Sequence, residues 1–264
     1  MIVSVLFNEF ILYSFLGWIW ETVYCTIKTK HWSNRGFLFG PICPIYGTGG
    51  IIAKVIFFYT PAFRSNETSV WLVFIICAAG SAVLEYLTSW LMEKIFHARW
   101  WDYSDLPLNL HGRIALPTTI CFGLAGILIV RYLFPVVGNA DGMIPLFIHE
   151  ILSLFLMGLM GCDFALTKAS LTPLVQKIEA MQQNFDERAE QIVAASDIAQ
   201  RRERMCALEQ QFKIRLKDQA KALTVRQRYI LDNMQGFHAG KGHIISIGER
   251  LKTAAKDIVE NSGE

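Results

Sequence analysis

Eight polar residues in the first half of the chain could form a binding site, although the surrounding sequence is strongly apolar. They comprise two carboxylates inside long apolar stretches and six side chains from two polar connections: Glu21, Asn34, Arg35, Glu85, Asp102, Asn109, His111 and Arg113. A charged residue at the centre of a membrane helix costs about 2.5–3.5 kcal/mol, so each carboxylate needs a partner or a function. Arginine holds phosphate oxygens through paired hydrogen bonds, and histidine serves as a general acid or base. The set therefore predicts a ligand-binding site, with no catalytic residue assigned.

Two unusual connections would bring these side chains to one face. In the first connection, glycine and proline residues interrupt any regular helix; they are Gly36, Gly40, Pro41, Pro44 and Gly47. Irregular backbone at membrane depth is tolerated only where it is buried in protein or lines a polar cavity. The second, 99–114, is rich in Trp and Tyr, which membrane interfaces favour, but its Asp, Asn, His and Arg residues have no such explanation. We therefore expect the two carboxylates, two arginines and the histidine to line one cavity.

Five apolar segments must position these residues. They cover residues 6–27, 42–60, 70–92, 115–134 and 144–167. Each is close to the roughly 17–25 residues that a helix needs to cross the hydrocarbon core of a bilayer. The sequence thus predicts an all-α, polytopic membrane helix bundle with five transmembrane helices, forming a domain over residues 1–169.

The basic residues between these segments predict the topology. Connections 28–41 and 93–114 contain six lysines and arginines, whereas 61–69 and 135–143 contain only Arg64. Basic residues remain on the cytoplasmic side of a membrane. We therefore expect a multi-pass protein of the bacterial cytoplasmic membrane, with its N-terminus outside and its C-terminus in the cytoplasm.

Residues 170–264 form a second predicted domain, a polar cytoplasmic tail of amphipathic, coiled-coil-like helices. Three apolar stripes recur at helical spacing; they begin at Ile178, Met205 and Ile244. Each stripe is narrow and needs a partner surface, which could be another copy of the tail, a folded-back hairpin or a second protein. We expect a homo-oligomer, in its simplest form a homodimer, that associates through the tail.

Several short motifs resemble those of a known family. They are Phe15-Leu16-Gly17-Trp18 with Glu21, Arg35-Gly36-Phe37-Leu38 with Gly40-Pro41, Pro44-Ile45-Tyr46-Gly47, Glu85-Tyr86, Trp101-Asp102-Tyr103, and Asn109-Leu110 with Gly112-Arg113-Ile114. Over about residues 6–135 the chain resembles the bacterial membrane family called Putative ABC-transporter type IV, or CmpB-like. The resemblance implies a multi-helix membrane protein with a role in transport. Because the chain has no Gly-x-x-x-x-Gly-Lys-[Ser/Thr] phosphate loop, a transport role would require a separate ATPase subunit.

Three functions remain open from the sequence. The first is a permease-like transport component whose polar site at the cytoplasmic interface binds a small solute or ion. The second is a membrane-embedded enzyme that acts on a lipid head group, with Arg35 and Arg113 holding a phosphate and His111 or a glutamate as acid or base. The third is a scaffold whose helical tail recruits partners. Membrane lipids are expected partners in all three.

Composition narrows the partners further. The net charge of +2 gives no indication of nucleic-acid binding. The six cysteines lack metal-ligand spacing, and the chain shows no nucleophile motif. We expect neither a metal nor a cofactor.

Overall fold

The structure is a computed structural model that describes residues 2–30, 32, 35–63, 68–96, 98–195, 198–234, 236–237 and 247–262. It is 83% helical, which confirms the all-α prediction. The chain divides into two compact units. The first unit consists of Met1–Leu91 and Asp102–Leu166, and the second of Met92–Trp101 and Thr167–Glu264.

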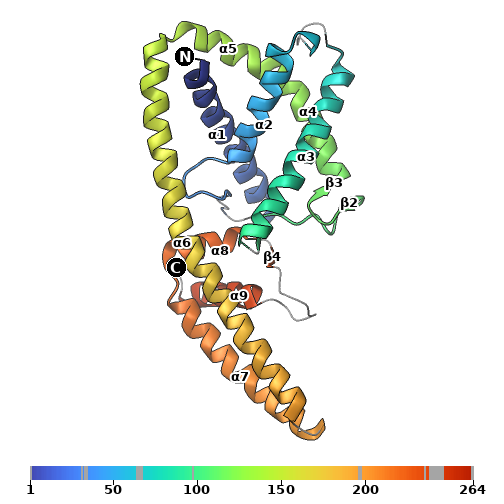
Figure 1. Ribbon diagram of the computed structural model, residues 1–264, viewed down its shortest axis with the longest axis vertical. Helices are drawn as coiled ribbons and strands as arrows, with labels where there is room; N and C mark the ends of the chain where they lie inside the picture. The colour runs from blue at the N-terminus through green and yellow to red at the C-terminus, as the bar shows by residue number, and fades with distance from the viewer. Residues whose placement is uncertain are drawn as a thin grey trace. The chain divides into compact units, whose positions relative to one another are not determined.

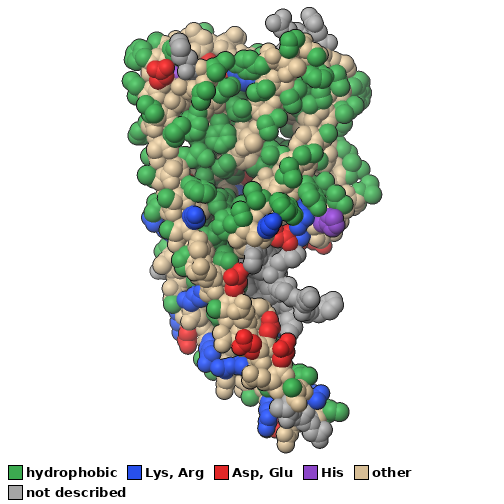
Figure 2. Space-filling model, viewed as in Figure 1, with side chains coloured by type: hydrophobic (Ala, Val, Ile, Leu, Met, Phe, Trp, Pro, Cys, Tyr) green, Lys and Arg blue, Asp and Glu red, His purple; other side chains and the backbone are tan. Residues whose placement is uncertain are grey.

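The first unit contains the apolar helices (Figure 1). In chain order its elements are α1 Ile2–Thr29, α2 Pro44–Lys54, the π-helix η1 Val55–Tyr59, the 3-10 turn η2 Pro61–Phe63, α3 Val70–Phe96, β2 Asn109–Leu110, β3 Ile114–Ala115, α4 Leu116–Leu128, the π-helix η3 Ile129–Leu133, α5 Phe134–Met143 and the first part of α6 Leu146–Ala195. Hydrophobic side chains cover the visible surface of these helices, as Figure 2 shows, and charged side chains gather on the later part of α6 and on α7.

Within the described residues, four helices are long and apolar enough to cross a membrane. They are Ile2–Thr29, Val70–Phe96, Leu116–Met143 and Leu146–Ala194. The predicted second span is a shorter apolar helix, Pro44–Tyr59. The prediction of apolar membrane helices is therefore confirmed, but five transmembrane helices are not.

One predicted connection is helical. Residues 135–143 were expected to be a loop, yet α5 continues the helix of α4 to Met143. Pro135 stands in the first turn of α5, directly after the π-helical turn η3. Proline cannot donate the backbone hydrogen bond of a regular helix, and the wider π turn that precedes it accommodates this loss. The prediction of a loop here was wrong because the chain continues as a helix through proline.

Glycines bring α1 and α2 into close contact. A Cβ atom at Gly17 would overlap the Tyr46 ring, and one at Gly47 would overlap Ser14. A Cβ at Gly50 would lie 2.6 Å from the Tyr13 ring. Small residues at a helix interface are the usual means by which membrane helices approach closely. The α1–α2 pair is thus a fixed framework on which polar side chains of both helices can meet.

The second unit is a helical hairpin with two further helices. It contains the later part of α6, α7 Ile198–Lys221, α8 Val225–Asn233 and α9 Ile247–Ser262, and a short antiparallel pairing of β1 Ala98–Arg99 with β4 Gly236–Phe237. The apolar stripes of α6 and α7 face one another, and the rings of Phe185 and Phe212 are 4.9 Å apart. A folded-back hairpin, one of the three expected arrangements, therefore supplies the partner surface.

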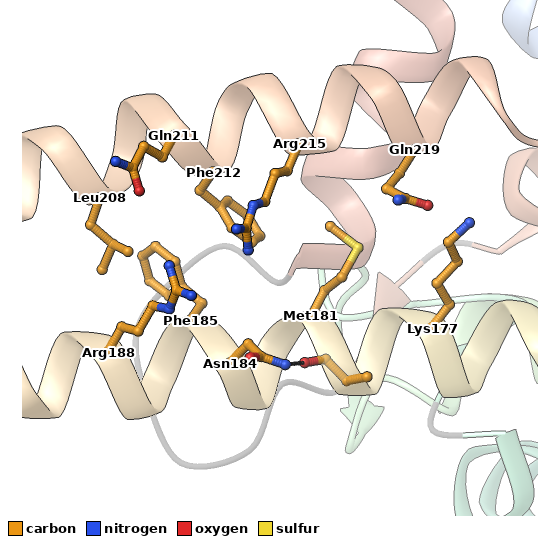
Figure 3. A pocket seen from close by; sticks show the side chains of 11 residues that line it. Lys177, Met181, Asn184, Phe185, Arg188, Leu208, Gln211, Phe212, Arg215 and Gln219 are labelled. Atoms are coloured by element: carbon orange, nitrogen blue, oxygen red, sulfur yellow. Dashed lines mark hydrogen bonds between the residues drawn. The ribbon is translucent and has the colours of Figure 1, made fainter.

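A shallow groove of about 220 Å³ runs between α6 and α7 (Figure 3). Phe185, Phe212 and Leu208 form its apolar part, and all three are buried. Lys177, Arg188, Arg215 and polar side chains line the rest.

Replacing the central aromatic residue of this hairpin should loosen it. Phe212→Ala removes a buried side chain and should cost about 3 kcal/mol. This corresponds to roughly 100-fold faster exchange of the amide hydrogens in α7, measured by hydrogen–deuterium exchange and mass spectrometry of the full chain. Ile214→Ala, at a position on the same helix that is 63% exposed, is the control and should change exchange little. Equal effects of the two substitutions would show that the Phe185–Phe212 contact does not hold the hairpin together.

Candidate functional site

Two carboxylates from different helices approach each other in the first unit, and each accepts a hydrogen bond from a tyrosine. Tyr46 of α2 donates to Glu21 Oε1 of α1. Tyr103 donates to Glu85 Oε1 of α3 over 3.2 Å. Glu85 is 6% exposed, and the charges of the two carboxylates are near enough to repel each other. We call these four residues the Glu21–Glu85 cluster.

The packing of α1 against α2 explains the position of Tyr46. Gly17 lies one helical turn before Glu21, so both point to the same side of α1. The absence of a side chain at Gly17 leaves the space that the Tyr46 ring occupies. The ring therefore passes over Gly17 and its hydroxyl reaches Glu21.

A tight hairpin in the connection after α3 positions Tyr103. Strands β2 and β3 pair antiparallel, with Asn109 opposite Ala115. The turn between them needs left-handed backbone at His111, with φ of 55°, and at Gly112, with φ of 68°. The Tyr103 amide donates to the Gly112 carbonyl over 2.7 Å, which fixes the tyrosine beside the hairpin. Burial raises the pKa of the Tyr103 phenol above its usual range, so it remains a hydrogen-bond donor at neutral pH.

Two of the predicted site residues hold this connection in shape. Asp102 Oδ1 accepts hydrogen bonds from the Ser104 amide at 2.9 Å and from its hydroxyl at 2.5 Å. Asn109 Nδ2 donates to the carbonyls of Ser104 and Leu106, and its Oδ1 accepts from the Gly112 amide. Both residues are exposed. These bonds stabilise the loop, and a direct role of either residue in ligand binding stays a prediction.

The other polar residues of the hairpin meet on Tyr86, the neighbour of Glu85 in α3. Arg113 Nη1 donates to the Tyr86 hydroxyl over 3.2 Å, and the guanidinium lies 5.1 Å from the centre of the tyrosine ring. His111 Nδ1 lies 3.3 Å from the same hydroxyl. A guanidinium and an imidazole therefore both contact the phenol of Tyr86. We call these three residues the Arg113–Tyr86–His111 contact group.

The interrupted segment before α2 is held by protein groups. Asp163 of α6 accepts hydrogen bonds from the amides of Phe39, at 3.1 Å, and Gly40, at 2.9 Å. The Cys43 amide donates to the Ser14 carbonyl of α1 over 2.9 Å, and Leu38 is 1% exposed. The irregular backbone is thus buried in protein, one of the two conditions under which it is stable at membrane depth.

Arg35, at the start of this segment, reaches toward Glu21 through a cysteine. Its guanidinium lies within hydrogen-bonding reach of the Cys25 thiol, which lies 4.0 Å from Glu21 Oε2. Asn34, the remaining predicted site residue, lies outside the described residues. The structure therefore places Arg35 and Cys25 beside Glu21, and it places Glu85 within range of the Glu21 charge. His111 and Arg113 contact Tyr86 instead.

A comparison with family models identifies the family of the chain. The model of the family described as Putative ABC-transporter type IV matches residues 8–168. The chain belongs to this family. The predicted membership is confirmed, and the match extends beyond the expected residues 6–135 into α6. Membership of the type IV family, together with the apolar helices, indicates a membrane protein related to transport.

Other comparisons add nothing to the type IV assignment. No curated protein and no solved structure matches the chain. Among the residues that the structure describes, no group of three or more His, Cys, Asp or Glu side chains could hold a metal ion.

The region matched by the type IV family contains a second polar cluster that was not predicted from the sequence. Lys54 of α2 forms an ion pair with Glu9 of α1, and both are buried. Asn8 Nδ2 donates to the His149 carbonyl over 3.0 Å and lies 3.2 Å from His149 Nδ1. The charges of Glu9 and Lys54 inside apolar segments were visible in the sequence, and the same cost argument that singled out Glu21 applies to them.

Proposed function

We propose that this protein is the membrane component of a transport assembly and that the Glu21–Glu85 cluster binds a small cationic solute. One observation carries the proposal. The Glu85 Oε2 atom is buried and, among the described residues, receives no hydrogen bond. A buried acceptor without a donor is costly, so a ligand that supplies a donor or a positive charge would be stabilised there.

The surroundings favour a cation over other solutes. Two carboxylates near each other in a poorly solvated site repel, and a positive charge between them would remove this repulsion. Tyr46 and Tyr103 each donate a hydrogen bond to one of the carboxylates. The hydroxyls of the tyrosines hold the carboxylates in position by donating to them.

The arrangement of α1 and α2 supports a five-pass topology as part of the proposal. Tyr46 meets Glu21 near one end of α1, and Lys54 meets Glu9 near the other. Helix α2 therefore runs antiparallel to α1 over much of its length, although α2 and η1 together are shorter than an ordinary span. With the interrupted segment as its cytoplasmic end, α2 would be the short second crossing, the N-terminus would lie outside and the polar tail in the cytoplasm.

The proposal includes two partners. A separate ATPase would supply energy, because the chain contains no phosphate loop. Two copies of the chain would associate through the tail. Because the apolar stripes of α6 and α7 pack on each other, this association would use the exposed face of the α6–α7 hairpin.

The binding site can be tested with the full chain in detergent. The thermal unfolding temperature is measured with choline, spermidine, sodium, potassium, inorganic phosphate and phosphoethanolamine as separate probes. We expect at least one cationic probe to raise the unfolding temperature of the natural protein and to have no such effect on Glu85→Gln. Glu150→Gln, an identical substitution at an exposed position of α6, should retain the shift.

Two results would contradict the cationic ligand. If no cationic probe raises the unfolding temperature, or if Glu85→Gln retains the shift, the cluster does not bind cations. If only phosphate or phosphoethanolamine stabilises the protein, and Arg113→Ala abolishes that effect, the site recognises a head group. The second candidate function, an enzyme acting on a lipid head group, would then be favoured, as the Arg113–Tyr86–His111 contact group would allow.

A further inference from the structure

Two carboxylates, one near the beginning of α1 and one near the end of α5, lie close to each other. Glu9 of α1 is 1% exposed and lies within hydrogen-bonding reach of Asp141 of α5. Within the described part of the chain, Glu9 Oε2 and Asp141 Oδ2 are buried and neither receives a hydrogen bond. Two ionised carboxylates offer only acceptors to each other, so this approach is unfavourable unless something positive lies between them.

The remaining groups of this site define its charge. Within the described residues, the titratable and charged side chains around it are Glu9 and Tyr13 from α1, Lys54 from α2, Tyr59 from η1, Asp141 from α5 and His149 from α6. The ammonium of Lys54 pairs with Glu9 Oε1 and neutralises one carboxylate. Among the residues that the structure describes, no ion pair compensates the second carboxylate.

Histidine 149 does not supply that charge. Its Nε2 lies 3.4 Å from the Asp141 carbonyl, which can only accept, so Nε2 carries a hydrogen. Its Nδ1 faces the Nδ2 donor of Asn8 and therefore acts as an acceptor. These partners fit the neutral imidazole, which fixes the end of α5 against the start of α6.

We propose that Glu9 and Asp141 form a proton-binding site, in which a single proton is shared between the two carboxyl groups beside Lys54. The bound proton gives an O–H···O⁻ bond between Glu9 Oε2 and Asp141 Oδ2 and makes the group of three charged residues neutral. Release of the proton leaves one net negative charge in an apolar bundle, which is costly. Proton binding would therefore stabilise the contact between α1 and α5, and its loss would weaken it.

A metal cation fits this place less well than a proton. Hard cations require a shell of several oxygen ligands, and the ammonium of Lys54 on Glu9 would repel a second cation. This site is distinct from the Glu21–Glu85 cluster, and it does not depend on the proposed transport ligand. On α1 the two sites are separated by the turns that contain Tyr13 and Gly17.

The proton can be observed directly by infrared spectroscopy of the full chain in lipid nanodiscs. A protonated carboxyl group shows a C=O stretch that a carboxylate lacks. We expect the natural protein at neutral pH to show such a band, and Asp141→Asn and Glu9→Gln each to abolish it. In both variants the amide can donate the hydrogen that the proton supplied, so the fold should persist, and size-exclusion chromatography checks this. Glu150→Gln, at an exposed position of α6, is the matched control and should retain the band.

The outcome of this measurement distinguishes a shared proton from a metal cation between Glu9 and Asp141. A band that persists in both Asp141→Asn and Glu9→Gln, or is absent from the natural protein, overturns the proposal. The same measurement with N-methylglucamine in place of sodium and potassium tests the metal alternative. A carboxylate spectrum that changes only when sodium or potassium is added would assign a metal cation to the site and would also overturn it. If one variant fails to fold, loss of the band in the other suffices for support, and its persistence there refutes the proposal.

Discussion

Replacing Lys54 by methionine should destabilise the helix bundle by about 3–5 kcal/mol, the cost of removing one partner from a buried ion pair. Lys54 is 7% exposed and its ammonium contacts Glu9, which is 1% exposed. Methionine retains most of the aliphatic length but removes the charge. Glu9 and Asp141 would then face each other without the ammonium of Lys54, and one of them would have to remain neutral or leave the interior. The measurement is unfolding of the detergent-solubilised protein, followed by intrinsic tryptophan fluorescence.

Two comparisons separate the ion pair from general effects of the substitution. Lys168→Met makes the same change at an exposed position and should alter the free energy of unfolding by less than about 0.5 kcal/mol. The double variant Lys54→Met, Glu9→Gln removes both charges and should recover a large part of the lost stability, because the penalty comes from the uncompensated carboxylate. If the double variant were as unstable as the sum of the two single variants, the buried pair would not be the reason for the loss.

The apolar helices could be predicted from sequence because a membrane imposes a simple rule on length and composition. Segments 6–27 and 70–92 correspond to α1 and α3, with ends that extend a few residues further. The second segment was harder to predict. Its helix begins only at Pro44 and already ends at Tyr59, so α2 and η1 together are shorter than a full membrane span. Hydropathy alone does not distinguish such a short, packed helix from a complete crossing.

The candidate site was predictable only in part. The cost of a carboxylate in an apolar segment pointed to Glu21 and Glu85, and the structure brings them together. The donors that hold them, Tyr46 and Tyr103, could not be assigned as partners, because the pairing depends on the register of α2 against α1 and on the fold of the hairpin after α3. Tyrosine near a membrane end has a sufficient explanation as an interfacial residue, and this explanation concealed the role of Tyr103.

In the tail, too, the sequence predicted the local helices but not which helices contact each other. The stripes through Phe185 and Phe212 correctly indicated helices with one apolar face. Nothing in the spacing determined whether these faces would meet within one chain or between two. The hairpin satisfies the stripes internally, so an association of two tails would have to use other surfaces.

The largest effect of an apparently minor change is expected at Gly17. Gly17→Ala adds a single methyl group, and its carbon would overlap Cβ and Cγ of Tyr46. These atoms are the part of a tyrosine that cannot move without rotating the whole side chain or shifting the helix backbone. We expect a loss of about 3 kcal/mol in the free energy of unfolding, the upper part of the usual range for overpacking. The tyrosine hydroxyl should also leave Glu21, so the stabilisation by a cationic probe should fall together with the stability.

Two glycines elsewhere in the apolar helices provide controls, because alanine at these positions should not lower the free energy of unfolding. A Cβ at Gly80 of α3 or Gly158 of α6 meets no atom within 4 Å in the described structure. Alanine is preferred to glycine within a helix by about 1 kcal/mol, so Gly80→Ala and Gly158→Ala should leave stability unchanged or raise it. The free energies of unfolding of the three variants, measured under one detergent condition, test the close contact of α1 and α2. If Gly17→Ala proved as stable as Gly80→Ala, the Tyr46 ring would not lie over Gly17, and the tyrosine-held carboxylate of the proposed site would lose its structural basis.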